Sequence, residues 1–174
     1  MGLGSVRGVR PDIRRLSVAA VLVSLVVVTG CTGGESDKPT LEEATKQLIA
    51  DGDKLLASRE VAASGKVTAT ERADKDTESG CVPGQVQRFF RAQGDLSGPP
   101  AVHMPYNSAG LMQSVLKFMG YDSVVNDRDL GDENLGVSVV HNPKMGLTFT
   151  VTVRNGQKPN IMIVGKTSCY AHGR

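Results

Sequence analysis

The sequence predicts an α+β domain: an antiparallel meander sheet with two helices packed on one face. Apolar residues recur at helical intervals over about 41–58 and 107–120, and at every second position in six other segments. Turn signals separate the later segments closely enough to require hairpins, which pair strands antiparallel. The predicted order is helix, two strands, helix and four strands, in one domain at residues 40–174.

Residues 1–30 have the layout of a secretory signal peptide. Arg7, Arg10, Arg14 and Arg15, against the single acid Asp12, precede an apolar run at 16–28. That run is shorter than the roughly 20 residues a permanent transmembrane helix needs. The segment is therefore expected to direct export. Arg14-Arg15 leaves the twin-arginine route open beside the general secretory route.

The apolar run ends at Val28-Thr29-Gly30-Cys31, which resembles the bacterial lipobox. In lipobox proteins the signal peptide is removed before the cysteine, whose sulfur carries a diacylglycerol. The resemblance implies that Cys31 is lipidated, and that acyl chains such as palmitate anchor the protein on the extracytoplasmic face of the cell membrane. Residues 31–39, rich in Gly and polar residues, then form a flexible tether.

The basic excess of the chain belongs to the signal peptide. Residues 1–30 hold four of the 20 Lys and Arg and one of the 18 Asp and Glu, which leaves 16 and 17 and a net charge of −1. Since the mature part has no global basic field, a nucleic-acid partner is not expected.

Two cysteines are left after Cys31. Cys81 and Cys169 form an even pair in an exported chain, so a disulfide is the expected outcome. The alternative is a reactive thiol, for which Cys169 has His172 three residues away.

The first helix and the first two strands follow from local signals. Thr40 and Glu43 have capping-box spacing, and leucines at helical intervals extend to about residue 58, with Gly52 a weak point. Residues 64–74 and 85–96 read as strands, and the short polar turn between them favours antiparallel pairing. Phe89 and Phe90 are expected to divide between a half-exposed sheet face and the core.

The second helix is predicted between Asn107 as N-cap and Gly120 as a left-handed terminator. Its apolar residues are expected to pack in the core: Leu111, Met112, Val115, Leu116, Phe118 and Met119.

Four strands are predicted in the last third, at 121–127, 135–141, 147–154 and 159–167. Asn155-Gly156 marks the hairpin between the last two. In 147–154 leucine, phenylalanine and valine alternate with threonine, so the threonine side is expected to face water.

No motif for catalysis, metal binding or phosphate binding is present. His103, His141 and His172 stand apart, without zinc-ligand spacing. The acidic loop 126–134 contains Asp127 and Asp129 but fails the EF-hand pattern, although an irregular ion site stays open. No catalytic residue, cofactor or metal is therefore predicted.

The layout of the mature chain resembles the small lipoproteins of high-GC Gram-positive (actinobacterial) bacteria. The residues that carry this resemblance are Cys81 and the stretches "RAQGDL", "FMGYD", "LTFTVTV" and "PNIMIVGKTSCY". It implies a one-membrane envelope and supplies no catalytic residues. The function expected is a non-enzymatic binding or structural module for an envelope protein or a small ligand. The alternative is an envelope hydrolase or metal-dependent enzyme using His103, His141, Asp127 and Asp129.

Overall fold

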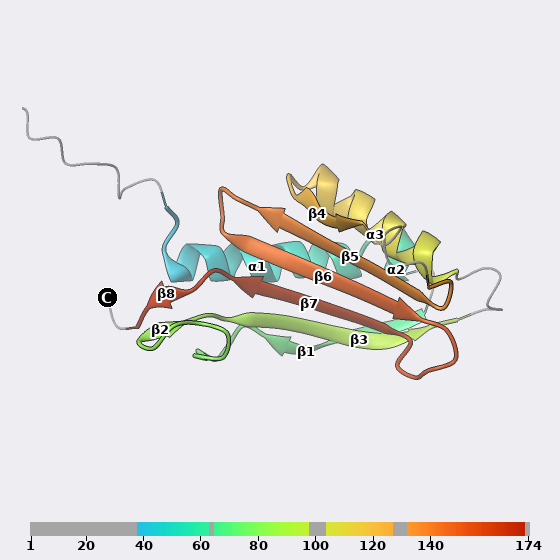
Figure 1. Ribbon diagram of the computed structural model, residues 1–174, viewed down its shortest axis with the longest axis horizontal. Coiled ribbons are helices and arrows are strands. Elements are labelled where there is room, and N and C mark those ends of the chain that lie inside the picture. Colours follow the sequence, from blue (N-terminus) through green and yellow to red (C-terminus); the bar gives the residue numbers. More distant parts are fainter. Residues whose placement is uncertain (1–37, 63–64, 98–103, 127–131, 173–174) are drawn as a thin grey trace, which may run out of the picture. The chain divides into compact units, whose positions relative to one another are not determined.

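A computed structural model describes residues 38–62, 65–97, 104–126 and 132–172. They form a six-stranded antiparallel sheet of order β1-β3-β7-β6-β5-β4 with helices packed on it, which confirms the predicted α+β class (Figure 1). The elements are α1 (Leu41–Leu56), α2 (Arg59–Ala62), β1 (Gly65–Arg72), β2 (Gln85–Val86), β3 (Phe89–Leu96), α3 (Pro105–Phe118), β4 (Asp122–Asn126), β5 (Leu135–Asn142), β6 (Leu147–Arg154), β7 (Ile161–Thr167) and β8 (Tyr170–Ala171).

Helix α1 begins with the predicted capping box. The Glu43 backbone N–H donates to Thr40 Oγ1 at 3.2 Å, and the Thr40 N–H donates to Glu43 Oε2 at 2.8 Å. The helix ends at Leu56, two residues before the predicted end, and the short α2 follows. α1 runs unbroken through Gly52, whose bare Cα faces the Phe90 ring; a methyl group there would lie 2.6 Å from the ring carbon Cζ.

Helix α3 differs from its prediction at its start and on its exposed face. It begins at Pro105, so Asn107 is not the N-cap; proline suits a first helical position because the N–H it lacks would have no helical partner. Gly120 follows the helix at φ +90°, as predicted. Leu111 and Phe118 were predicted in the core, but 54% and 93% of their surfaces are exposed, because the sheet covers a neighbouring arc of the helix.

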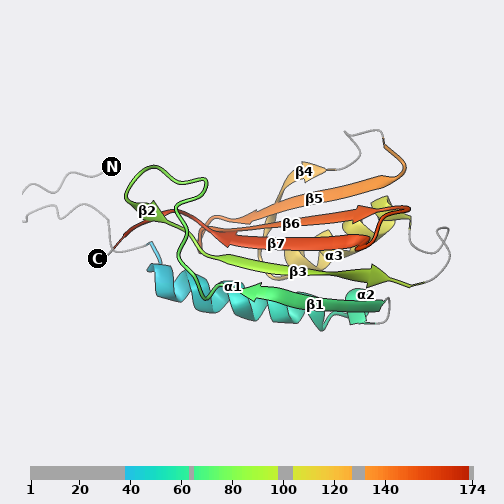
Figure 2. The same ribbon diagram turned by 90° about the horizontal axis from the view of Figure 1, so that it is seen from below.

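The sheet contains both predicted strand groups. β1 pairs antiparallel with β3, and β4 to β7 form the predicted meander. Pairing of β3 with β7 joins the two groups into one sheet (Figure 2). The segment predicted as one strand at 85–96 divides into β2 and β3, because β2 leaves the main sheet to pair with β8.

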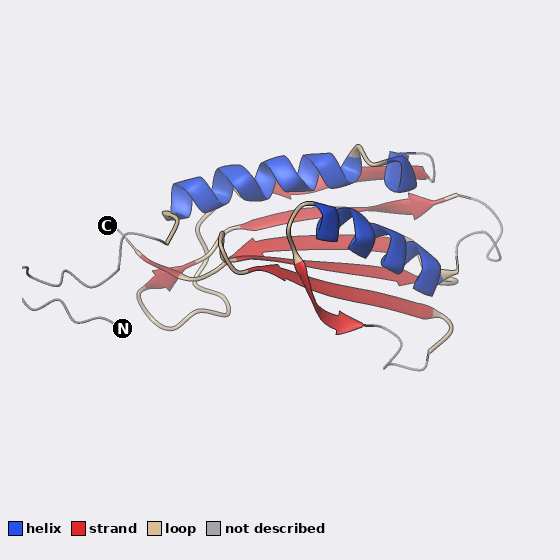
Figure 3. Cartoon of the chain, turned by 90° about the horizontal axis from the view of Figure 1, so that it is seen from above, coloured by secondary structure: helices blue, strands red, loops and turns tan. Residues whose placement is uncertain are grey.

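The core lies between the helices and one face of this sheet. Figure 3 shows α1 and α3 lying across the same face. Their buried side chains, such as Leu48, Met112 and Leu116, belong to one core with Phe149 and Val151 of β6. The threonines that alternate with those β6 residues are only partly buried on the other face, which confirms the predicted alternation.

Two glycines provide a matched test of the helix–sheet packing. A methyl group at Gly136 of β5 would overlap the Pro105 carbonyl at the start of α3, whereas nothing lies within 4 Å of one at Gly110. Gly136→Ala should therefore lower the free energy of unfolding by about 2 kcal/mol. Gly110→Ala, in the interior of α3, should raise it by about 0.5–1 kcal/mol. Urea denaturation measures both, and equal effects would contradict this account of the packing.

Candidate functional site

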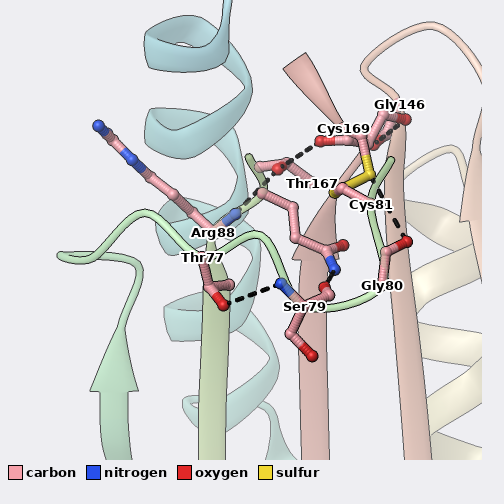
Figure 4. The surroundings of a disulfide bond; sticks show 10 residues. Thr77, Ser79, Gly80, Cys81, Arg88, Gly146, Thr167 and Cys169 are labelled. Carbon is pink, nitrogen blue, oxygen red and sulfur yellow. Dashed lines mark hydrogen bonds between the residues drawn. A yellow bond between two sulfur atoms is a disulfide. The ribbon is translucent and has the colours of Figure 1, made fainter. Parts of the chain in front are cut away.

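Cys81 and Cys169 form a disulfide, as predicted, with a Cα–Cα distance of 5.7 Å (Figure 4). The bond excludes the alternative of a reactive thiol at Cys169 paired with His172, whose side chain is exposed. Cys169 Sγ also lies 3.8 Å from the Gly80 carbonyl oxygen. This is a contact and not a hydrogen bond, because a disulfide sulfur carries no proton.

The disulfide belongs to a structural end of the molecule. The chain from Thr77 to Gln87 folds back on itself through a β-bridge, and the buried Gln87 side chain donates to the Ser79 carbonyl. β2 pairs with β8, and the His172 N–H donates to the Gly84 carbonyl at 2.9 Å. These contacts hold the loop that contains Cys81 against the end of β7.

Of the residues considered for catalysis, the structure describes His141 and His172. His103, Asp127, Asp129 and the predicted lipidation site Cys31 lie outside the described residues. His141 Nδ1 lies 3.1 Å from Thr148 Oγ1, on the next strand. Among the described residues, no three His, Cys, Asp or Glu side chains are grouped as a metal site would require.

A hollow of about 630 Å³ lies beside His141, where the chain enters α1. Its lining includes Lys38, Lys144, Ser168 and Tyr170. The Ser168 hydroxyl donates to the Gly146 carbonyl at 3.0 Å, so its proton is not directed to His141. Burial, and secondarily the charge of Glu43, raises the pKa of the Tyr170 phenol. The hollow therefore brings cations and hydroxyls together without a nucleophile–base pair.

The larger feature is the sheet face opposite the helices, here called the open sheet face. Its centre consists of residues that alternate with the buried positions of β5, β6 and β7. In the strand register, Thr150 lies between Val139 and Val164, and Thr152 lies between Val137 and Met162. All six are at least partly exposed, and Met162 reaches 43%. Figure 2 views the sheet from the side opposite α3, so the strands lie in front of that helix.

Charged residues border this apolar centre. Arg91 places its guanidinium 4.4 Å from the centre of the Phe89 ring and pairs with Glu71 at 2.8 Å. Five cations and three anions of the described residues lie on or beside the open sheet face: Lys66, Arg91, Arg154, Lys158 and Lys166, against Glu71, Asp95 and Asp122. The border is therefore net positive, although residues 31–174 together carry a net charge of −1.

A second hollow lies at the β1–β3 side of the open sheet face. It measures about 790 Å³ and is floored by polar side chains of the two strands, including Lys66, Thr68 and Gln93. Lys158, in the hairpin between β6 and β7, lines one side of this hollow, and its amine lies 3.9 Å from Asp95. This polar hollow lies between the apolar centre and the β1 edge of the sheet.

Sequence reasoning missed a buried carboxylate. Asp51 of α1 is 1% exposed and accepts hydrogen bonds from the Tyr121 hydroxyl at 2.8 Å and from Gln47 Nε2 at 2.9 Å. The Tyr121 ring contacts Phe149 edge-on at 5.5 Å. Burial first, and then the charge of Asp51, raises the pKa of the Tyr121 phenol far above its usual value. This hydrogen bond joins α1 to Tyr121, which closely follows α3, and we assign it a structural role.

The Asp51–Tyr121 bond predicts an alkaline effect on stability. At neutral pH, Tyr121→Phe should lower the free energy of unfolding by about 1–2 kcal/mol, because Asp51 loses a donor. Above pH 10, the usual tyrosine pKa, the phenol ionises in the unfolded chain but stays neutral in the folded one, so the natural protein loses stability as pH rises. The difference in free energy of unfolding between the natural protein and Tyr121→Phe, measured by urea denaturation, should therefore become smaller above pH 10. A difference that stays constant would contradict the raised pKa of Tyr121.

Among the described residues, no helix combines the length and apolar character needed to cross a bilayer. Comparisons with protein-family models, curated proteins and solved structures find no match to this chain. The surfaces of the folded chain are therefore the basis for inferring its function.

Proposed function

We propose that the chain is a lipid-anchored module on the extracytoplasmic face of the cell membrane, and that it binds a partner protein through the open sheet face. The observation that carries the proposal is the uncovered apolar centre of that face, Val137, Val139, Met162 and Val164, inside a charged border. An apolar centre with a polar, accessible rim is the usual anatomy of a protein–protein interface.

The dimensions of the open sheet face fit such an interface. Six strands about 4.8 Å apart, most of them seven or eight residues long at about 3.4 Å per residue, span about 650 Å². A stable complex buries about 800 Å² on each partner, so the face and its border supply nearly a full interface. The net positive border favours a partner whose contact surface carries acidic residues around an apolar centre, because opposite charges steer association and fix the register.

The anchor is proposed from the sequence around Cys31. A short apolar run after a basic segment, ending in small residues and a cysteine, fits lipid attachment, and several acyl chains at about 0.8 kcal/mol per buried methylene retain a protein on a bilayer. The Cys81–Cys169 disulfide supports an oxidising location, since such bonds persist outside the reducing cytosol.

Cys31→Ser should abolish attachment of the mature chain to the membrane. Serine offers no thiol for the lipid, so the chain should be released to the medium or kept as an uncleaved precursor. Membrane fractionation and intact mass distinguish these results, with Cys81→Ser as the control that keeps the anchor. A membrane-bound Cys31→Ser chain of the mature mass would contradict the proposed lipidation.

The partner surface can be tested by photocrosslinking in intact cells. A photoreactive phenylalanine at Met162 or Gln93, both on the open sheet face, should capture the same protein. The matched control is Val82, which is 60% exposed in the loop beside the disulfide and should not capture it.

Charge reversal sharpens this test. Lys166→Glu, at the border of the open sheet face, should reduce capture from Met162 by roughly tenfold, because an acidic partner would meet a like charge. Capture that is equal from Met162 and Val82, or unchanged by Lys166→Glu, would count against the open sheet face as the binding surface.

A further inference from the structure

Helix α3 carries more apolar surface than the core covers. Its buried side is Ala109, Met112 and Leu116, whereas Met104, Leu111 and Phe118 are exposed at 46%, 54% and 93%. Leu111 and Phe118, seven residues apart, lie on one side of the helix with the half-buried Val115 between them, and Met104 directly precedes the first helical residue. Met104, Leu111, Val115 and Phe118 are called the α3 stripe below.

We propose that the α3 stripe docks into the lipid surface to which the chain is anchored. The proposal rests on the proposed lipidation of Cys31, and it adds an orientation that the anchor by itself does not impose. A helix with an exposed apolar side lies in the headgroup–acyl boundary and buries that side in lipid.

The charge of this segment suits a bilayer with anionic lipids. Residues 104–121 contain no Asp or Glu, and Lys117 is their one Lys or Arg. An anionic surface repels carboxylates, so a segment free of them can approach it without an electrostatic penalty. By contrast, the neighbouring surface of α1 carries Glu42 and Glu43 in its first turn.

The chain length between anchor and domain permits the contact. Eight residues lie between Cys31 and Thr40, so nine residue-to-residue steps give a maximum span of about 30 Å. Tyr121, which closely follows α3, bonds to Asp51, eleven residues along α1 from Thr40 and thus about 16 Å along its axis. The end of α3 therefore lies within reach of a bilayer that holds the acyl chains of Cys31.

A second copy of the chain fits the α3 stripe less well. A helix of 14 residues is about 21 Å long, so a stripe about 10 Å wide offers about 200 Å², a quarter of what each partner of a specific complex buries. A bilayer does not need that area, because the acyl anchor already confines the domain next to it. Since the helices cover the opposite side of the sheet, docking would turn the open sheet face away from the membrane (Figure 3).

Tryptophan fluorescence can test the docking, because the chain has no natural tryptophan. Phe118→Trp places one reporter on the α3 stripe, and Leu111→Trp provides a second. Met162→Trp, 43% exposed on the open sheet face, is the matched control. The chain beginning at Cys31 is coupled through that thiol to a maleimide lipid, which works because Cys81 and Cys169 are bonded to each other. The vesicles contain phosphatidylethanolamine and phosphatidylglycerol in equal parts, with or without brominated acyl chains.

In vesicles, emission from Phe118→Trp and Leu111→Trp should shift to shorter wavelength, and brominated chains should quench most of it. Emission from Met162→Trp should keep its wavelength and should not be quenched by the brominated chains. Unshifted, unquenched emission from both stripe reporters would overturn the proposal. A shift without bromine quenching that grows with protein density would also overturn it, in favour of a second copy on the stripe. Because the coupling is chemical, none of these outcomes depends on lipidation in cells, which the Cys31→Ser experiment tests separately.

Discussion

The structure depends on the burial of one side of the β6 strand beneath α1 and α3. Leu147, Phe149, Val151 and Val153 are almost fully buried, and burial of each such side chain contributes about 1.5–3 kcal/mol. The strands on either side, β5 and β7, add Val140, Ile161 and Ile163 to the same layer. Because the described chain has only these two long helices, the layer forms on one side of the sheet, and the opposite side stays open.

That asymmetry separates two surfaces with different properties. The open sheet face is wide, with mostly β-branched side chains at its centre and charges around it, which suits another folded protein. The α3 stripe is narrow and has no acidic residues, which suits a fluid lipid surface. Their placement on opposite sides of the sheet makes the two proposals compatible, since a domain held to lipid by α3 would present the open sheet face outward.

Several features at the ends of the elements serve stability. The disulfide joins Cys81, in the loop before β2, to Cys169, in the link between β7 and β8, 88 residues apart in sequence. Within the packing layer, the Asp51–Tyr121 hydrogen bond joins α1 to the residue that precedes β4. A buried carboxylate is costly without donors, and here tyrosine and glutamine side chains supply two.

Local sequence signals predicted the class of fold, the capping of α1, the antiparallel hairpins, the outward threonines of β6 and the pairing of Cys81 with Cys169. These features arise from local signals: side-chain periodicity, turn residues, a capping pair and cysteine count. Local signals did not predict the pairing of β7 with β3, the division of residues 85–96 into β2 and β3, or the exposure of Phe118, which the folded structure shows. The folded structure also shows that Gly52 accommodates a phenylalanine ring. Each of these depends on which residues from distant segments meet, and the apolar pattern of α3 is wider than the arc that the sheet can cover, so periodicity could not show which part of that arc faces the core.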